Sequence, residues 1–331
     1  MKKTATVIVF EEDPYNSMFN VLFADILNLP DVYPLIEKSL PVKYFYKFLP
    51  SRKLHALTFG LSHKLYLRYY ELPRKVKELS RNYERINILF HNAGLRRPEY
   101  PMVVFDYLKK FPVTLNLLYL DLHEHEYVCR HANFLCEKKV FDRVMTFDPG
   151  DAHKYNMELC FTPYSKIPLV ETCSSTLLYY CGTNGGRIYG LHNIWRMAKK
   201  NNVNIKYDLV WCKDFEHFFE NDPNIYFHDS IVAYPILLNE MQQSECVLDF
   251  TQSGQSGFTL RPYEAVVYNK KLLTNNKRIF EFPFYNERYM KYFENAEDID
   301  WNWLKTPIDV DYGYNEEFSP KALLQKINEN R

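Results

Sequence analysis

The chain has 331 residues, of which 47% are hydrophobic and 25% are charged, and its 41 basic and 41 acidic residues leave a net charge of zero. This is the composition of a globular protein, and the length is sufficient for two domains with separate hydrophobic cores. The balanced charge argues against a general nucleic-acid-binding protein.

Cysteine usage and hydropathy bear on the compartment. The 7 cysteines are an odd number and are scattered along the chain, which suits reduced thiols in the cytosol better than a disulfide framework. The apolar run near the N-terminus is short and ends at Glu11, so we interpret it as a strand rather than as a signal peptide. No apolar run reaches the length of a membrane span, and we expect a cytoplasmic protein.

Strand and helix patterns alternate through the first half of the chain. Strands are predicted up to Phe10 and at residues 42–48, 86–90, 114–120 and 143–146. Helices are predicted at residues 17–27 and through residues 130–134. Strands that alternate with helices predict a parallel sheet, and therefore a Rossmann-like domain.

Residues 52–85 combine amphipathic helical spacing with nine basic and three acidic residues. Such a surface could meet anionic lipid headgroups or the phosphates of a lipid-linked acceptor, which would make the protein peripheral at the inner face of a membrane. A solvated helix face above a core stripe explains the same pattern. The sequence leaves both interpretations open.

Polar residues follow three of the predicted strands. Asp13 lies in the loop after the first strand, His91 follows the strand at 86–90, and Asp121 follows the strand at 114–120. Loops after strands carry ligand-contacting groups in α/β folds. The two carboxylates could equally be helix caps, Asp13 before Pro14 and Asp121 before the next helix.

The second half repeats the alternation. Pro163 and Pro168 mark the crossing between the halves. A strand at 177–181 is followed by a small-residue turn that includes Gly182 and ends at Arg187, and a helix begins near Tyr189. Further strands are predicted at 205–211 and 225–228, and a helix at 235–241.

A strand at residues 246–250 leads into a loop of small residues, and a helix opens near Thr259 with Pro262 in its first turn. Small residues let backbone N–H groups approach a ligand closely, and the helix N-terminus adds partial positive charge. Together these features predict a phosphate site, to which Arg261 adds a charged fork. An ordinary βα turn packed with small residues is the alternative.

Residues 254–265 read GQSGFTLRPYEA, and the next predicted strand ends in Thr274, Asn275 and Asn276. This order resembles the donor-binding half of GT-B glycosyltransferases, above all bacterial enzymes of surface-polysaccharide and lipopolysaccharide assembly. The resemblance implies that the loop amides face a pyrophosphate, that Arg261 supports its charge and that Glu264 holds the ribose hydroxyls. The implied donor-binding residues are Gly182, Arg187, Ser253, Gly254, Gln255, Ser256, Gly257, Thr259, Arg261 and Glu264.

The resemblance extends to the end of the first half, where residues 161–164 look like its last strand. It implies two Rossmann-like domains whose parallel sheets face a central cleft. We expect an acceptor domain at 1–168, a nucleotide-sugar domain at 169–296 and a C-terminal segment at 297–331. Ser319 as N-cap and Pro320 at the first position predict a final helix at 319–328. In the GT-B fold this helix often returns to the first domain.

The resemblance also implies the chemistry. Such an enzyme moves a sugar from a nucleoside diphosphate donor to a glycan or lipid-linked acceptor. Helix N-termini and basic side chains, rather than a metal ion or another cofactor, stabilise the leaving group. An inverting enzyme needs a general base, for which Asp121 and Asp13 rank above His91 because carboxylates commonly serve. The sequence leaves the stereochemistry open.

The same sequence bears on other functions. The spacing of a structural zinc site is absent among His123, His125, Cys129, His131 and Cys136. The acidic pairs at 298–300 and 309–311 match the DxD string that holds a divalent metal in the other glycosyltransferase fold. They follow the last obvious strand, so we interpret them as chance pairs. No GxGxxG follows the first strand, which weakens an NAD-dependent oxidoreductase. A non-catalytic GT-B-like protein that binds nucleotide or glycan and supports a partner enzyme remains the alternative to a transferase.

Overall fold

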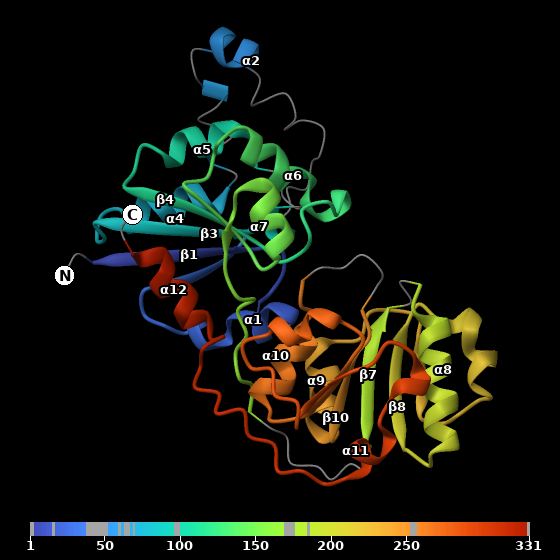
Figure 1. Cartoon of the computed structure of the whole chain (residues 1–331). Helices are drawn as coiled ribbons and strands as arrows, with labels where there is room; N and C mark the ends of the chain where they lie inside the picture. The colour runs from blue at the N-terminus through green and yellow to red at the C-terminus, as the bar shows by residue number, and fades with distance from the viewer. Residues whose placement is uncertain are drawn as a thin grey trace. The chain divides into compact units, whose positions relative to one another are not determined.

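The computed structural model describes residues 3–14, 17–37, 52–58, 61–62, 67–68, 70–95, 100–168, 176–183, 186–251 and 257–329. The chain forms two compact units, one of Met1–Ser165 with Ser319–Arg331 and the other of Lys166–Phe318. Each unit holds a six-stranded sheet with helices around it (Figure 1). All pairs among the described strands are parallel, which confirms the prediction of two Rossmann-like α/β domains.

The sheet of the first unit has the strand order β2-β1-β3-β4-β5-β6. Its strands are β1 (Thr4–Phe10), β2 (Val32–Ile36), β3 (Arg85–His91), β4 (Val113–Tyr119), β5 (Arg143–Thr146) and β6 (Glu158–Leu159). The described helices are α1 (Met18–Leu27), α2 (Arg52–Leu57), α4 (Glu71–Leu79), α5 (Met102–Leu108), α6 (Glu126–Glu137), α7 (Pro149–Tyr155) and α12 (Pro320–Asn328).

The central strands β1 and β3 are buried along almost their whole length. Strands covered on both faces of a parallel sheet read as continuous apolar runs, which is why the sequence located them well. Side chains of α4, α5 and α6 pack into one hydrophobic core with alternate residues of β1, β3 and β4, among them Val7, Val9, Ile88, Phe90 and Leu117.

The predicted C-terminal helix forms as α12 and belongs to the first unit. It contacts α1, and Ser319 Oγ both caps the helix at Lys321 N and donates to Asp25 Oδ2 at 2.7 Å. At the other end, Arg143 donates to the carbonyl of Lys326 and pairs with Glu158 at 3.2 Å. A cation at the last turn suits the negative end of the helix dipole.

Three expectations about the first unit are corrected by the structure or concern residues outside the described ranges. The strand expected at 42–48 lies outside the described residues, whereas β2, which pairs with β1, was not predicted. Residues 161–164 are irregular, and the last strand is β6, which pairs with β5 just before Pro163. The helical spacing of residues 52–85 extends further than the helices, because the described helices there are α2 and α4 and β3 begins at Arg85.

The second unit has the strand order β12-β11-β10-β7-β8-β9. Its strands are β7 (Leu178–Thr183), β8 (Ile205–Val210), β9 (Ile225–His228), β10 (Cys246–Asp249), β11 (Lys271–Thr274) and β12 (Met290–Tyr292). Its helices are α8 (Ile188–Lys200), α9 (Tyr234–Gln243), α10 (Leu260–Val267) and α11 (Trp301–Lys305). Counted from β7, this is the 3-2-1-4-5-6 order of dinucleotide-binding folds, and the strand order reverses between β7 and β10.

The unit boundaries differ slightly from the expected ones. The first unit ends at Ser165 rather than at residue 168, and residues 297–318 lie in the second unit, where α11 packs into the core with α8 and β7. The strand β12 was not predicted, because the aromatic and charged sequence after Glu281 carries no strand pattern.

Candidate functional site

The carboxyl ends of β7 and β10 meet at the point where the strand order of the second unit reverses. Ligands of open α/β sheets bind at this point. Two helices begin there, α8 directly after β7 and α10 after the loop that follows β10. Their unsatisfied N–H groups and dipoles favour an anion. The fold therefore places the predicted phosphate-binding elements at one edge of one sheet.

Arg187 joins the two strands. It is the N-cap residue of α8, and its guanidinium donates to the Thr183 carbonyl at 2.7 Å, to Thr183 Oγ1 at 3.2 Å and to the Phe250 carbonyl at 3.3 Å. Its Nε is buried and has no hydrogen-bond partner within the part of the chain that the structure describes. The sequence predicted a cation beside this turn. The structure adds that Arg187 makes hydrogen bonds at the ends of both β7 and β10, the two strands between which the strand order reverses.

Gly190 makes this arrangement sterically feasible. A Cβ at this position would overlap the ring of Phe250. The ring of Phe250 therefore packs on the first turn of α8, while its carbonyl meets Arg187. No local sequence pattern marks Gly190, because the close approach involves a residue 60 positions away.

Asp249 ties the start of α10 to the sheet. It is the buried last residue of β10, and it accepts hydrogen bonds from Thr259 Oγ1 at 2.8 Å and Thr274 Oγ1 at 2.7 Å. Thr259 also caps α10 by accepting from Arg261 N at 3.1 Å. Burial raises the pKa of the Asp249 carboxyl, and the two threonine hydroxyls oppose that shift.

The predicted donor loop is only partly described. Ser253, Gly254, Gln255 and Ser256 lie outside the described residues. The residues on either side are held by the end of β11. Thr251 donates from its N–H to Asn275 Oδ1 at 2.8 Å, and Asn276 Nδ2 donates to the Gly257 carbonyl at 3.2 Å. The strand end noted in the sequence thus anchors both flanks of the loop.

Arg261 and Glu264 form a buried ion pair on α10. The second oxygen of Glu264 accepts from the hydroxyl of Tyr234 on α9, and Arg261 also reaches Cys181 Sγ at 3.0 Å. Glu264 has no exposed surface, whereas the Arg261 side chain is 16% exposed. Burial raises the pKa of the Glu264 carboxyl, and Arg261 opposes the shift.

The ion pair bears on the roles expected for Arg261 as a phosphate ligand and for Glu264 as a ribose ligand. Arg261 keeps some exposed surface at the head of α10, as a phosphate ligand would need. Glu264 has no exposed surface and both of its carboxylate oxygens accept hydrogen bonds, so the ribose role requires the side chains that cover it to move. That role stays a prediction. Nothing in the sequence pointed to Tyr234 as a partner.

In the first unit, His91 is fully buried at the end of β3. Its ring lies 4.4 Å from the ring of Phe19, and its Nδ1 accepts from Gly94 N at 2.9 Å. Burial lowers the pKa of His91 to about 3, so the imidazole is neutral at pH 7. With no exposed surface it is a structural residue in this geometry, which argues against its use as a general base.

Asp121 differs from His91 in being only half-buried. Its Oδ2 accepts from Asn92 Nδ2 at 2.8 Å, and Asn92 Oδ1 accepts from Leu120 N at 2.7 Å. Asn92 therefore fixes the carboxylate at the carboxyl end of β4. Asp13 is exposed in the loop after β1. Asp121 thus combines solvent access with a fixed orientation, whereas His91 has no exposed surface.

The side chains that suggested a metal have other partners. Cys129 Sγ donates to the Leu122 carbonyl at 3.4 Å, and His131 lies 3.0 Å from the Tyr100 carbonyl. Asp298 and Asp300 cap short helices. Among the described residues, no three His, Cys, Asp or Glu side chains are grouped so as to hold a metal ion. Likewise, none of the helices described has the length and apolarity to cross a bilayer.

No protein-family model matches the chain, and no curated protein matches it significantly. Solved structures do. An OtsA apo structure aligns over 99% of this chain and 100% of its own, with 8% identity and a TM-score of 0.54. A protein named as a UDP-N-acetylglucosamine 2-epimerase from Listeria monocytogenes aligns over 99% and 96%, with 12% identity and a TM-score of 0.53.

A third match is an alpha,alpha-trehalose-phosphate synthase (UDP-forming) from Burkholderia vietnamiensis, which aligns over 98% of this chain and 96% of its own. Its identity is 8% and its TM-score is 0.51. At such identities a match speaks for the fold alone. Together with the two parallel sheets, these matches confirm the GT-B fold class that the sequence predicted.

Proposed function

We propose that the protein is a glycosyltransferase that takes its sugar from a nucleoside diphosphate donor bound by the second unit. The observation that carries the proposal is the meeting of Arg187, Arg261 and two helix N-termini at the strand-order reversal. A pyrophosphate is the ligand that this combination suits, because guanidinium groups and helix N–H groups both donate to phosphate oxygens. The named activities of two similar structures involve UDP or a UDP-sugar, which favours a uridine donor.

The same groups would serve the reaction. When the glycosidic bond to the donor breaks, negative charge develops on the leaving diphosphate. Fixed positive groups stabilise that charge without reorganising, which is a large catalytic contribution and requires no metal ion. We assign the acceptor to the first unit, and Asp121 as the base that takes the acceptor's proton if the reaction inverts the anomeric centre.

We further propose that the acceptor is a glycan or a lipid-linked glycan of bacterial cell-surface polysaccharide synthesis, and that the enzyme works in the cytoplasm or at the inner face of the membrane. The support is the resemblance of residues 254–265 to enzymes of that kind and the basic segment at 52–85.

The test is a panel of UDP-, GDP-, CDP- and dTDP-sugars, with binding followed by thermal shift and turnover by nucleotide release. Slow hydrolysis of one donor, accelerated by an acceptor pool, is the expected result. Binding without turnover, acceptors included, would favour the non-catalytic alternative. If none of the four nucleotides binds to the wild-type protein, the proposal fails.

A second candidate is a sugar-nucleotide epimerase, which is favoured by the similarity to the Listeria monocytogenes protein. An epimerase needs no acceptor and changes the sugar itself. Incubation with UDP-N-acetylglucosamine alone, followed by NMR of the sugar ring, separates the two functions. Signals of a sugar with inverted configuration at C2 would favour the epimerase. Signals of the unchanged sugar together with released UDP would favour the transferase.

A further inference from the structure

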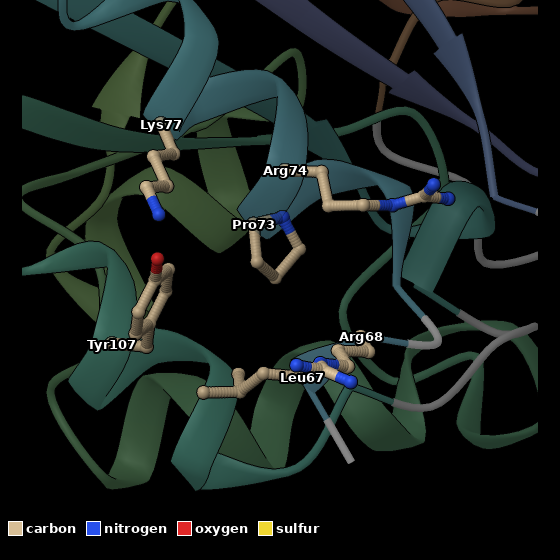
Figure 2. A pocket seen from close by; sticks show the side chains of 6 residues that line it. All are labelled: Leu67, Arg68, Pro73, Arg74, Lys77 and Tyr107. Atoms are coloured by element: carbon tan, nitrogen blue, oxygen red, sulfur yellow. The ribbon is translucent and has the colours of Figure 1, made fainter. Parts of the chain in front are cut away.

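A pocket on the helical layer of the first unit is lined by three cationic side chains, two apolar ones and a tyrosine (Figure 2). It has a volume of about 280 Å³. Its residues come from the turn before α4, from α4 itself and from the last turn of α5, and they are Leu67, Arg68, Pro73, Arg74, Lys77 and Tyr107. None of them belongs to the strand ends described above.

The positive charges of the pocket are poorly neutralised. Arg74 and Lys77 are three residues apart on α4 and therefore share a face. Arg74 is 64% exposed and forms a long ion pair with Glu71, at 3.9 Å. For Lys77 and Arg68 the structure records no ion pair with any of the described residues. Arg68, Arg74 and Lys77 therefore leave positive charge around the pocket, which would favour an anion there.

Lys75, on the same helix, shows the contrast. It pairs with Glu78 at 3.2 Å and lies 4.6 Å above the ring of Tyr33. It is not one of the lining residues. The helix therefore separates a neutralised cation on one face from two exposed cations on the pocket face.

The positive end of α4 does not account for the pocket. Tyr70, at the N-cap, makes no side-chain cap, and the carboxylate of Glu37 accepts from Glu71 N at 2.5 Å and Leu72 N at 3.2 Å instead. The buried carboxyl group of Glu37 thus already satisfies this helix terminus. The anion-binding capacity of the pocket resides in its side chains.

Apolar and aromatic groups complete the lining. Pro73 is buried, Leu67 is half-buried, and the hydroxyl of Tyr107 points toward the ammonium of Lys77 in Figure 2. The volume exceeds what a bare phosphate ion would fill. The pocket therefore suits a charged head joined to a less polar body.

We infer that this pocket binds a phosphate ester: an oxygen-rich, doubly or singly charged group carried on a glycerol-like or sugar-like body. Guanidinium groups bind phosphate through paired N–H donors, the lysine adds a point charge, and the tyrosine hydroxyl adds a donor. The ester can be the headgroup of an anionic lipid or a soluble molecule. The site is separate from the donor site, and the inference does not depend on the proposed activity.

The test compares two probes on the whole protein. The first is glycerol 1-phosphate, measured by isothermal titration calorimetry. The second is a vesicle of phosphatidylglycerol diluted in phosphatidylcholine, measured by co-sedimentation against pure phosphatidylcholine. The variants are Arg74→Gln and Lys77→Gln, and Lys75→Gln is the matched control that removes one charge from the same helix outside the pocket. Circular dichroism melting checks that each variant is folded.

Each pocket variant should weaken binding of the probe by about tenfold, as the loss of one charged hydrogen bond does, while Lys75→Gln should change it by less than about twofold. Loss of vesicle binding alone identifies a lipid source, and loss of glycerol phosphate binding identifies a soluble one. The inference is overturned if neither probe binds to the wild-type protein, or if Lys75→Gln weakens binding as much as the pocket variants do.

Discussion

Arg261 and Glu264 lie three residues apart on α10 and form an ion pair whose carboxylate is completely shielded from solvent. The pair links the expected phosphate ligand to the expected ribose ligand. Tyr234 donates to the other oxygen of Glu264. A substitution at any one of these three side chains should therefore change the hydrogen bonding of the other two.

Arg261→Ala should weaken donor binding and destabilise the second unit. The donor loses a charge-assisted contact worth about 1.5–3 kcal/mol. Folding loses more, about 3–5 kcal/mol, because the variant leaves the carboxylate of Glu264 buried without its cation. Titration with UDP and urea denaturation measure the two effects separately.

The matched control for this pair is the double variant Arg261→Ala with Glu264→Gln. Removing the orphaned charge should recover stability but not donor affinity. If the single variant binds UDP as the wild type does, Arg261 is not part of the site. Glu264→Gln alone should raise the donor KM, and an unchanged KM would remove its ribose role.

Asp121→Asn should abolish transfer and leave donor binding intact. The amide cannot accept a proton, yet it has the shape to keep the contact with Asn92. Transfer rates with an acceptor, measured together with the affinity for UDP, test whether Asp121 is the base. Asp13→Asn serves as the comparison, since Asp13 is exposed in a loop. Wild-type rates for Asp121→Asn would exclude it as the base.

Gly190→Ala should destabilise the protein by about 1–3 kcal/mol, the usual cost of overpacking, reduced by up to about 1 kcal/mol of gained helix propensity. The new methyl group would overlap the Phe250 ring. Urea denaturation measures the loss. Adding Phe250→Leu should recover most of it by vacating the space, and a double variant no more stable than Gly190→Ala would show that this contact is not the cause.

Glu37 should make stability depend on pH. Burial raises the pKa of its carboxyl above the ordinary value of 4.5, against the hydrogen bonds from Glu71 N, Tyr100 and Leu72 N. Folding thus favours the protonated form. This contribution to stability is fully present below pH 4.5 and is lost as the pH rises through the raised folded-state pKa.

Glu37→Gln mimics the protonated carboxyl and should remove this dependence. Relative to the wild type, the variant should gain stability as the pH rises through that window. Urea denaturation at several pH values from about 4 to about 8 follows the difference. The exposed Glu78 provides the control: Glu78→Gln should leave the slope as it is. A wild-type slope in Glu37→Gln would contradict the assignment.

Local sequence signals located the regular elements well where both faces of a strand are covered or a helix carries its own cap. The strand β5 has its expected limits, α1 and α10 begin beside their expected starts at Ser17 and Thr259, which cap them, and α12 begins at the expected cap Ser319. Such signals are local because periodicity and capping involve residues within one or two turns. The edge strands β2 and β12 were missed because they are short and carry mixed, half-exposed residues.

The candidate site likewise combines features that local sequence predicts with features that depend on distant contacts. The sequence alone determined that small-residue turns precede two helices, that cations stand beside them and that two α/β domains follow one another. Only the tertiary structure decided that Arg187 bridges Thr183 and Phe250, which are 67 positions apart, that Tyr234 donates to Glu264 and that His91 is shielded from solvent. The physical reason is that strand order, burial and charge pairing depend on contacts between distant segments, which no local pattern encodes.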